Sequence, residues 1–189
     1  EREFETRLRD RVQTALKDAP RLKEPILVHG QSGTGKSIAL ARLAFSVRND
    51  RRYPVLVASR ASRLPAVDEL DEFCMRAEDA GAEATLVVCD ANAQAARYRD
   101  LLRGFQSRGR RVVVVGSAYR LIDQKQPPGD GKHLIEAPPT LDDEEAANLT
   151  TVLREHASLT YTPSTSKLLL SAVYRILPEV RPRLAAGLA

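Results

Sequence analysis

The chain has 189 residues, a length that fits one large domain or one domain with a small appendage. It carries 29 Lys and Arg against 25 Asp and Glu, so its formal net charge of +4 is mild, and 43% of its residues are hydrophobic, as in globular proteins. Basic residues are not concentrated as they usually are in nucleic-acid-binding proteins, which argues against a nucleic-acid partner. No apolar run approaches the roughly 18 residues that span a bilayer, which argues against a membrane partner.

Cys74 and Cys89 are the two cysteines, too few for a disulfide framework or a four-cysteine zinc site. Both lie in apolar segments, so we expect buried free thiols. No N-terminal segment resembles a signal peptide, and we therefore expect a cytoplasmic protein. Because the chain opens on Glu1 and stops at Ala189, we expect it to be a piece of a longer protein.

Apolar periodicity alternates between helix and strand along most of the chain. We expect helices at 3–18, 36–48, 65–80 and 93–105. We expect strands at 26–28, 54–58, 84–89, 112–115 and 134–137. The uninterrupted valines at 112–115 are typical of a central strand that is buried on both faces. This alternation predicts a three-layer α/β/α fold with a five-stranded parallel sheet.

The pattern changes after Pro139, where no further strand is predicted. Thr140 is the expected N-cap of a helix that has acidic residues in its first turn and ends near Ala157. A second helix is expected from Ser164 or Thr165 to about residue 184. The sequence therefore divides into a sheet domain at 1–138 and a helical appendage at 139–189.

A glycine-rich segment between the first strand and the second helix matches the phosphate-loop pattern G-x-x-x-x-G-K-[ST] in full. Its glycines let backbone N–H groups form an anion nest, and the following helix adds its positive end. We expect Lys36 to reach the β- and γ-phosphates and the Ser37 hydroxyl to bind Mg²⁺. The residues expected to contact nucleotide are Gly30, Gln31, Ser32, Gly33, Thr34, Gly35, Lys36, Ser37 and Ile38.

Asp90 ends the third predicted strand and is the second candidate Mg²⁺ ligand. The alternative is that it caps the next helix. Hydrolysing ATPases often carry a glutamate after this aspartate to activate water, but here Ala91 follows, so we expect slow turnover. An N-K-x-D segment for guanine recognition is absent, which favours ATP and ADP over guanine nucleotides.

Ser117 and Arg120 follow the fourth predicted strand. In ATPases whose third strand carries the Mg²⁺ aspartate, the fourth strand inserts between the third and the first, giving the sheet order 5-1-4-3-2. Ser117 would then be a polar sensor near the γ-phosphate. Arg120 would be either a phosphate contact or a solvated charge.

Together these segments resemble the STAND class of signal-transduction P-loop NTPases, relatives of NACHT and NB-ARC domains and of AAA+ proteins. The resemblance rests on Arg2-Glu3-Phe4-Glu5, which is similar to an R-E-x-E segment, on Gly30–Ser37, on Asp90, and on Arg120 as an arginine sensor. It implies that 139–189 is a helical lid in which Pro178 packs on the base. It also implies effector and sensor domains flanking this region in the same chain, as in bacterial defence proteins.

These features favour a slowly hydrolysing, ATP-binding switch that controls its flanking domains, with a nucleotide-dependent homo-oligomer as one form of assembly. One alternative is an AAA+-type ATPase that acts on nucleic acid or protein. Another is a small-molecule kinase, in which the strand that carries the Mg²⁺ ligand usually lies directly beside the phosphate-loop strand. The sheet order 5-1-4-3-2 would exclude the kinase.

Overall fold

Five parallel strands form one sheet in the computed structural model, which describes residues 2–58, 64–118, 131 and 133–157. Their order is β2-β3-β4-β1-β5, which is the predicted order read from the opposite edge. The strands are β1 (Ile26–His29), β2 (Val55–Ala58), β3 (Thr85–Cys89), β4 (Val112–Ala118) and β5 (Leu134–Glu136). The three-layer α/β fold predicted from the sequence is confirmed.

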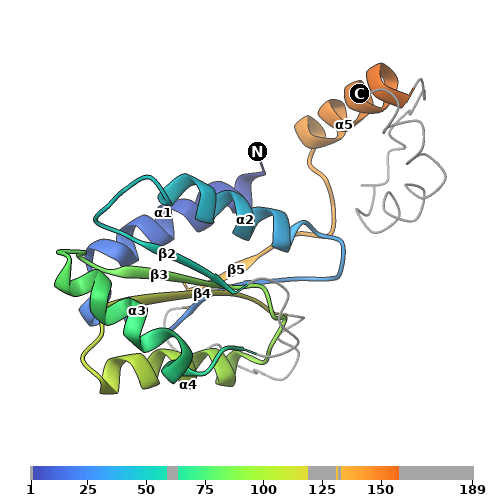
Figure 1. Ribbon diagram of the computed structural model, residues 1–189. Coiled ribbons are helices and arrows are strands. Elements are labelled where there is room, and N and C mark those ends of the chain that lie inside the picture. Colours follow the sequence, from blue (N-terminus) through green and yellow to red (C-terminus); the bar gives the residue numbers. More distant parts are fainter. Residues whose placement is uncertain (1, 59–63, 119–130, 132, 158–189) are drawn as a thin grey trace. The chain divides into compact units, whose positions relative to one another are not determined.

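Helices cover both faces of this sheet (Figure 1). The helices are α1 (Glu3–Lys17), α2 (Lys36–Val47), α3 (Val67–Asp79), α4 (Ala95–Ser107) and α5 (Asp143–Ala157), with a short 3₁₀ helix, η1 (Ala19–Arg21), after α1. Figure 1 shows α1 and α2 on one face and α3 and α4 on the other. The segment from residue 164 that was predicted to be helical lies outside the described residues.

The side chains of β4 alternate between two hydrophobic cores. Val113 and Val115 join the core under α1 and α2, whereas Val112 and Val114 join the core under α3 and α4. All four are at most 2% exposed, as expected for a central strand. The strand was predicted to end at Val115 but continues to Ala118, because its last residues pair with β1. This continuation brings Ser117 into the sheet.

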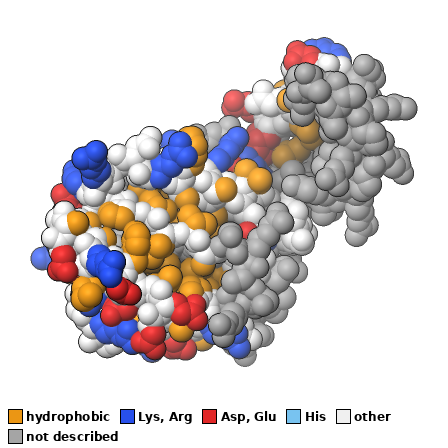
Figure 2. All heavy atoms as spheres, in the orientation of Figure 1, with side chains coloured by type: hydrophobic (Ala, Val, Ile, Leu, Met, Phe, Trp, Pro, Cys, Tyr) orange, Lys and Arg blue, Asp and Glu red, His pale blue; other side chains and the backbone are white. Residues whose placement is uncertain are grey.

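The edge strand β2 is less completely covered than the central strands. It pairs with β3, and its Val57 is 54% exposed. Figure 2 shows hydrophobic side chains gathered on this side of the sheet.

The two cysteines, Cys74 and Cys89, are buried free thiols, as predicted.

Two compact units make up the described chain, one of residues 2–30 and 35–137 and one of residues 31–34 with the described residues from 138 onward. In the second unit, α5 begins at Asp143 rather than directly after Thr140, and the prediction of Thr140 as its N-cap is wrong. Asp142 Oδ1 accepts the Glu145 N–H at 2.7 Å, and Glu145 Oε2 accepts the Asp142 N–H at 3.1 Å. This reciprocal capping box makes Asp142 the N-cap of α5. No helix in the described residues is both long and apolar enough to cross a membrane.

Candidate functional site

The glycine-rich loop joins the end of β1 to the start of α2. Gly30, Gly33 and Gly35 have φ values of 150°, 82° and 90°, in the region that favours glycine over residues with a Cβ. Gly35 is also the N-cap of α2, so the loop leads directly into the positive end of that helix. The Thr34 hydroxyl donates to the Gln31 carbonyl at 2.9 Å. This bond closes the turn formed by residues 31–34.

Lys36 is the first residue of α2 and is only 6% exposed. Its Nζ donates to the carbonyl of Gly30 at 2.9 Å, which places the ammonium group beside the glycine loop. Burial lowers the pKa of Lys36, and the negative charge of Asp90 partly opposes that effect. A buried ammonium group with few waters around it gains strongly from an anionic ligand.

Asp90 and Ser117 lie side by side because of the register of the sheet. The parallel pairing of β3 with β4 sets Cys89 opposite Gly116, so the next residues along the two segments are Asp90 and Ser117. Ser117 Oγ donates to Asp90 Oδ1 at 2.8 Å and accepts the Asn92 N–H at 3.1 Å. Asp90 does not cap α4, since the N-cap of that helix is Gln94.

The carboxyl ends of the central strands bring these groups to one edge of the sheet. β4 lies between β1 and β3, and its Ser117 is paired with Val28 of β1. The strand that precedes the glycine loop and the strand that precedes Asp90 therefore both adjoin Ser117. Ligands of open parallel sheets bind at this edge. The structure thus gathers Lys36, Asp90 and Ser117 in one place.

Other predicted site residues are placed less centrally or are not described. Gln31, Ser32 and Ser37 are exposed, and the Ile38 side chain is 54% exposed on α2. Arg120 and Pro178 lie outside the described residues. In the described part of the chain no cluster of three or more His, Cys, Asp or Glu could hold a metal ion. A carboxylate such as Asp90 and a hydroxyl such as Ser37 nevertheless suit Mg²⁺, which is bound by one or two protein oxygens together with phosphates and water.

Two residues near Asp90 were not predicted as part of the site. Asn92 has a φ of 45°, and its Oδ1 is buried without a hydrogen-bond partner among the described residues. Tyr98 of α4 is fully buried, and its hydroxyl donates to the Ser117 carbonyl at 2.7 Å. Asparagine tolerates the left-handed region better than most residues, which was a weak signal in the sequence. Tyr98 gave no such signal, because its contacts to Cys89 and Ser117 depend on how α4 packs on β3 and β4.

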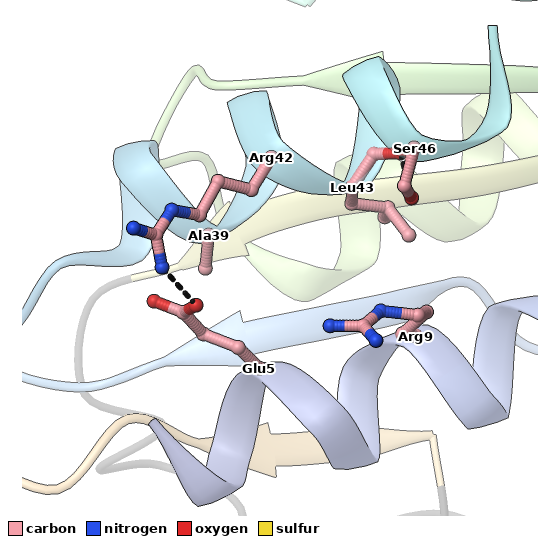
Figure 3. A pocket seen from close by; sticks show the side chains of 6 residues that line it. All are labelled: Glu5, Arg9, Ala39, Arg42, Leu43 and Ser46. Atoms are coloured by element: carbon pink, nitrogen blue, oxygen red, sulfur yellow. Dashed lines mark hydrogen bonds and ion pairs between the residues drawn. The ribbon is translucent and has the colours of Figure 1, made fainter. Parts of the chain in front are cut away.

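A separate pocket of about 380 Å³ lies between α1 and α2. In Figure 3, Arg42 reaches from α2 toward Glu5 of α1, with Arg9 further along α1. The pocket is lined by Glu5, Arg9, Ala39, Arg42, Leu43 and Ser46. It contains none of the residues gathered at the carboxyl edge of the sheet.

The fold and the glycine loop define a P-loop NTPase domain, and the comparisons identify its family. The family described as Novel STAND NTPase 5 matches residues 1–129, and the chain belongs to that family. The STAND resemblance predicted from the sequence is therefore confirmed. No curated protein sequence matches the chain.

Several solved structures are similar to the chain at low sequence identity. A chain of the E. coli MS115-1 HORMA:CdnC:Trip13 complex is similar with a TM-score of 0.52 and 15% identity, over 93% of this chain and 76% of that one. C. elegans PCH-2 is similar with a TM-score of 0.48 and 16% identity, over 95% of this chain and 60% of that one. AMPPCP-bound DnaA from Aquifex aeolicus is similar with a TM-score of 0.42 and 13% identity, over 98% and 60%. The chain thus spans about three fifths of the length of the last two.

Proposed function

We propose that this domain binds ATP with Mg²⁺, hydrolyses it slowly, and passes its nucleotide state to flanking effector and sensor domains. The observation that carries the proposal is that Lys36 lies close enough to Asp90 for their charges to interact. Lys36 is buried beside the glycine loop, and the charge of Asp90 acts on its ammonium group. A cationic phosphate contact next to a strand-end carboxylate is the arrangement that a magnesium-bound triphosphate requires.

Each residue has a distinct part in this proposed binding. The backbone N–H groups of Gly30–Gly35 and the first turn of α2 would hold the phosphates, and Lys36 would neutralise the β- and γ-phosphates. The Ser37 hydroxyl and the Asp90 carboxylate would hold Mg²⁺. Mg²⁺ held by these two residues would supply positive charge that offsets the negative charge of the phosphates.

Slow hydrolysis is proposed from the residues that surround Asp90. Ala91 has no group that could accept a proton from an attacking water. The Ser117 hydroxyl is already engaged, because it donates to Asp90 and accepts from Asn92. A domain that binds triphosphate firmly but lacks a base at this position keeps it bound for long periods, as a switch requires.

Residues 139–189 are proposed to act as a helical lid on the nucleotide domain at 1–138, with Arg120 on the phosphates and Pro178 on the base. Exchange of ATP for ADP would alter the lid and thereby the domains beside it. The small-molecule kinase is disfavoured, since β4 separates β1 from β3 in the sheet.

The test is the affinity of the purified chain for ATP and ADP, with and without Mg²⁺, together with its turnover rate. Lys36→Ala should weaken ATP binding by at least about tenfold, because a charge-assisted contact contributes roughly 1.5–3 kcal/mol. Lys23→Ala is the matched control, since Lys23 is an exposed lysine that precedes β1. ATP affinity that is unchanged in Lys36→Ala would overturn the proposal, and steady turnover stimulated by DNA would favour an AAA+-type motor instead.

A further inference from the structure

Tyr98 connects the helix after β3 to the ends of two strands. The hydroxyl of this fully buried side chain lies 2.7 Å from the carbonyl oxygen of Ser117 and 3.3 Å from that of Cys89. A phenol has one proton to donate, so the shorter contact to Ser117 is the stronger hydrogen bond. Burial raises the pKa of Tyr98 to about 12, which keeps the hydroxyl protonated and able to donate at neutral pH.

The position of the Tyr98 ring depends on Gly116. A Cβ at position 116 would lie 2.1 Å from Cε1 of Tyr98 and 2.8 Å from its hydroxyl oxygen. The ring therefore lies directly against the backbone of β4, at a distance that only glycine allows. This contact places the Tyr98 ring against Gly116, one residue before Ser117, whose carbonyl accepts the bond from the Tyr98 hydroxyl.

The Ser117 hydroxyl can point in only one direction. It accepts the Asn92 N–H, which can only donate, and it donates to Oδ1 of Asp90. The Asp90 carboxylate accepts this bond at Oδ1. Mg²⁺ would then be held by the other carboxylate oxygen, Oδ2. Ser117 is thus held at two points, since its carbonyl accepts a bond from Tyr98 and its hydroxyl donates to the carboxylate.

We propose that Tyr98 is a positioning residue, which acts through Ser117 to orient the Asp90 carboxylate for Mg²⁺. It sets how strongly Mg²⁺ increases the affinity for a nucleoside triphosphate, and it does not contact the nucleotide. The inference rests on the proposed function, because it needs the site to bind ATP with Mg²⁺.

The measured quantity is the ratio of the ATP dissociation constant in EDTA to that in excess Mg²⁺, obtained by calorimetry on the whole chain. Tyr98→Phe keeps the ring against Gly116 and removes only the hydroxyl. It should lower the ratio by about three- to tenfold, the range expected for one buried hydrogen bond, and leave the constant in EDTA unchanged. Tyr53→Phe is the matched control. Tyr53 is also buried, and its hydroxyl donates to Glu83 at 2.9 Å, but the residue precedes β2 and is not bonded to Ser117. Its ratio should equal that of the wild type.

Ser117→Ala provides a second variant, since it removes the side-chain link and keeps the carbonyl that Tyr98 binds. It should lower the same ratio. In the double variant the loss, expressed as a free energy, should be smaller than the sum of the two single losses, because both changes act through Ser117. A Tyr98→Phe or Ser117→Ala ratio equal to that of the wild type would overturn the inference and leave the proposed function standing. A wild-type protein whose ATP affinity does not respond to Mg²⁺ would overturn both.

Discussion

Glu5 of α1 and Arg42 of α2 form an ion pair across the pocket between the two helices, with Arg42 Nη1 2.9 Å from Glu5 Oε2 (Figure 3). The Glu5 side chain is only 8% exposed, whereas that of Arg42 is 62% exposed. Glu5 belongs to the Arg2-Glu3-Phe4-Glu5 segment, and α2 is the helix that begins at Lys36. The pair therefore fastens the N-terminal helix to the helix of the phosphate loop.

The unequal burial of this pair predicts unequal effects of breaking it. Arg42→Ala leaves a buried carboxylate without its partner and should lower the free energy of unfolding by about 1–2 kcal/mol, whereas Glu5→Gln leaves a solvated arginine and should cost less. Arg7→Ala is the control, because its ion pair with Glu3 is exposed and should contribute below about 0.5 kcal/mol. Urea denaturation measures all three, and equal losses for Arg42→Ala and Arg7→Ala would contradict the prediction.

Gly116 predicts a second stability effect. Gly116→Ala drives a methyl group into the Tyr98 ring and should lower the free energy of unfolding by about 1–3 kcal/mol, as overpacked cores do. Replacing Tyr98 with leucine in the same chain should recover part of the loss, because the smaller side chain leaves room. Urea denaturation of the single and double variants decides this. A Gly116→Ala protein as stable as the wild type would contradict the contact.

The sheet and the main site residues could be predicted because their signals are local. A phosphate loop between an apolar run and a helix, and an aspartate at the end of the run at 84–89, are visible without tertiary structure. The order of the strands could be predicted because it follows from the class of ATPase to which those motifs belong. Asp90 and Ser117 then lie side by side because β3 and β4 pair in parallel with Cys89 opposite Gly116.

The features that were missed depend on partners distant in sequence or on competition between nearby residues. Val115 looked like a strand end because glycine follows, but the bonds from β1 extend the strand to Ala118. Thr140 and Asp142 are both good N-caps by composition, and only the reciprocal bond with Glu145 selects Asp142. Tyr98 looked like an ordinary core aromatic.

His29 predicts a dependence of stability on pH. Burial lowers the pKa of His29 from its ordinary value of 6.5, Lys36 acts in the same direction, and Glu136 opposes them. The unfolded chain therefore binds this proton at a higher pH than the folded chain, so the free energy of unfolding should fall as pH drops from about 7 through the lowered pKa. His29→Gln should lose part of this fall. Urea denaturation between about pH 8 and pH 5 measures it, and identical pH profiles would contradict the assignment.

Asp90 predicts a separation of nucleotide binding from magnesium dependence. Asp90→Asn removes the charge that would hold Mg²⁺ and keeps an oxygen that can accept the bond from Ser117. ATP affinity in EDTA should stay the same or rise, because a carboxylate near a triphosphate repels it, whereas the increase caused by Mg²⁺ should shrink by about tenfold or more. Asp79→Asn is the control, since Asp79 is an exposed residue at the end of α3. Calorimetric titration of both variants with ATP, with and without Mg²⁺, provides the comparison. If Asp90→Asn kept the full effect of Mg²⁺, the ion would have to be held by other residues, and Ser117 would be ordering a carboxylate with no part in nucleotide binding.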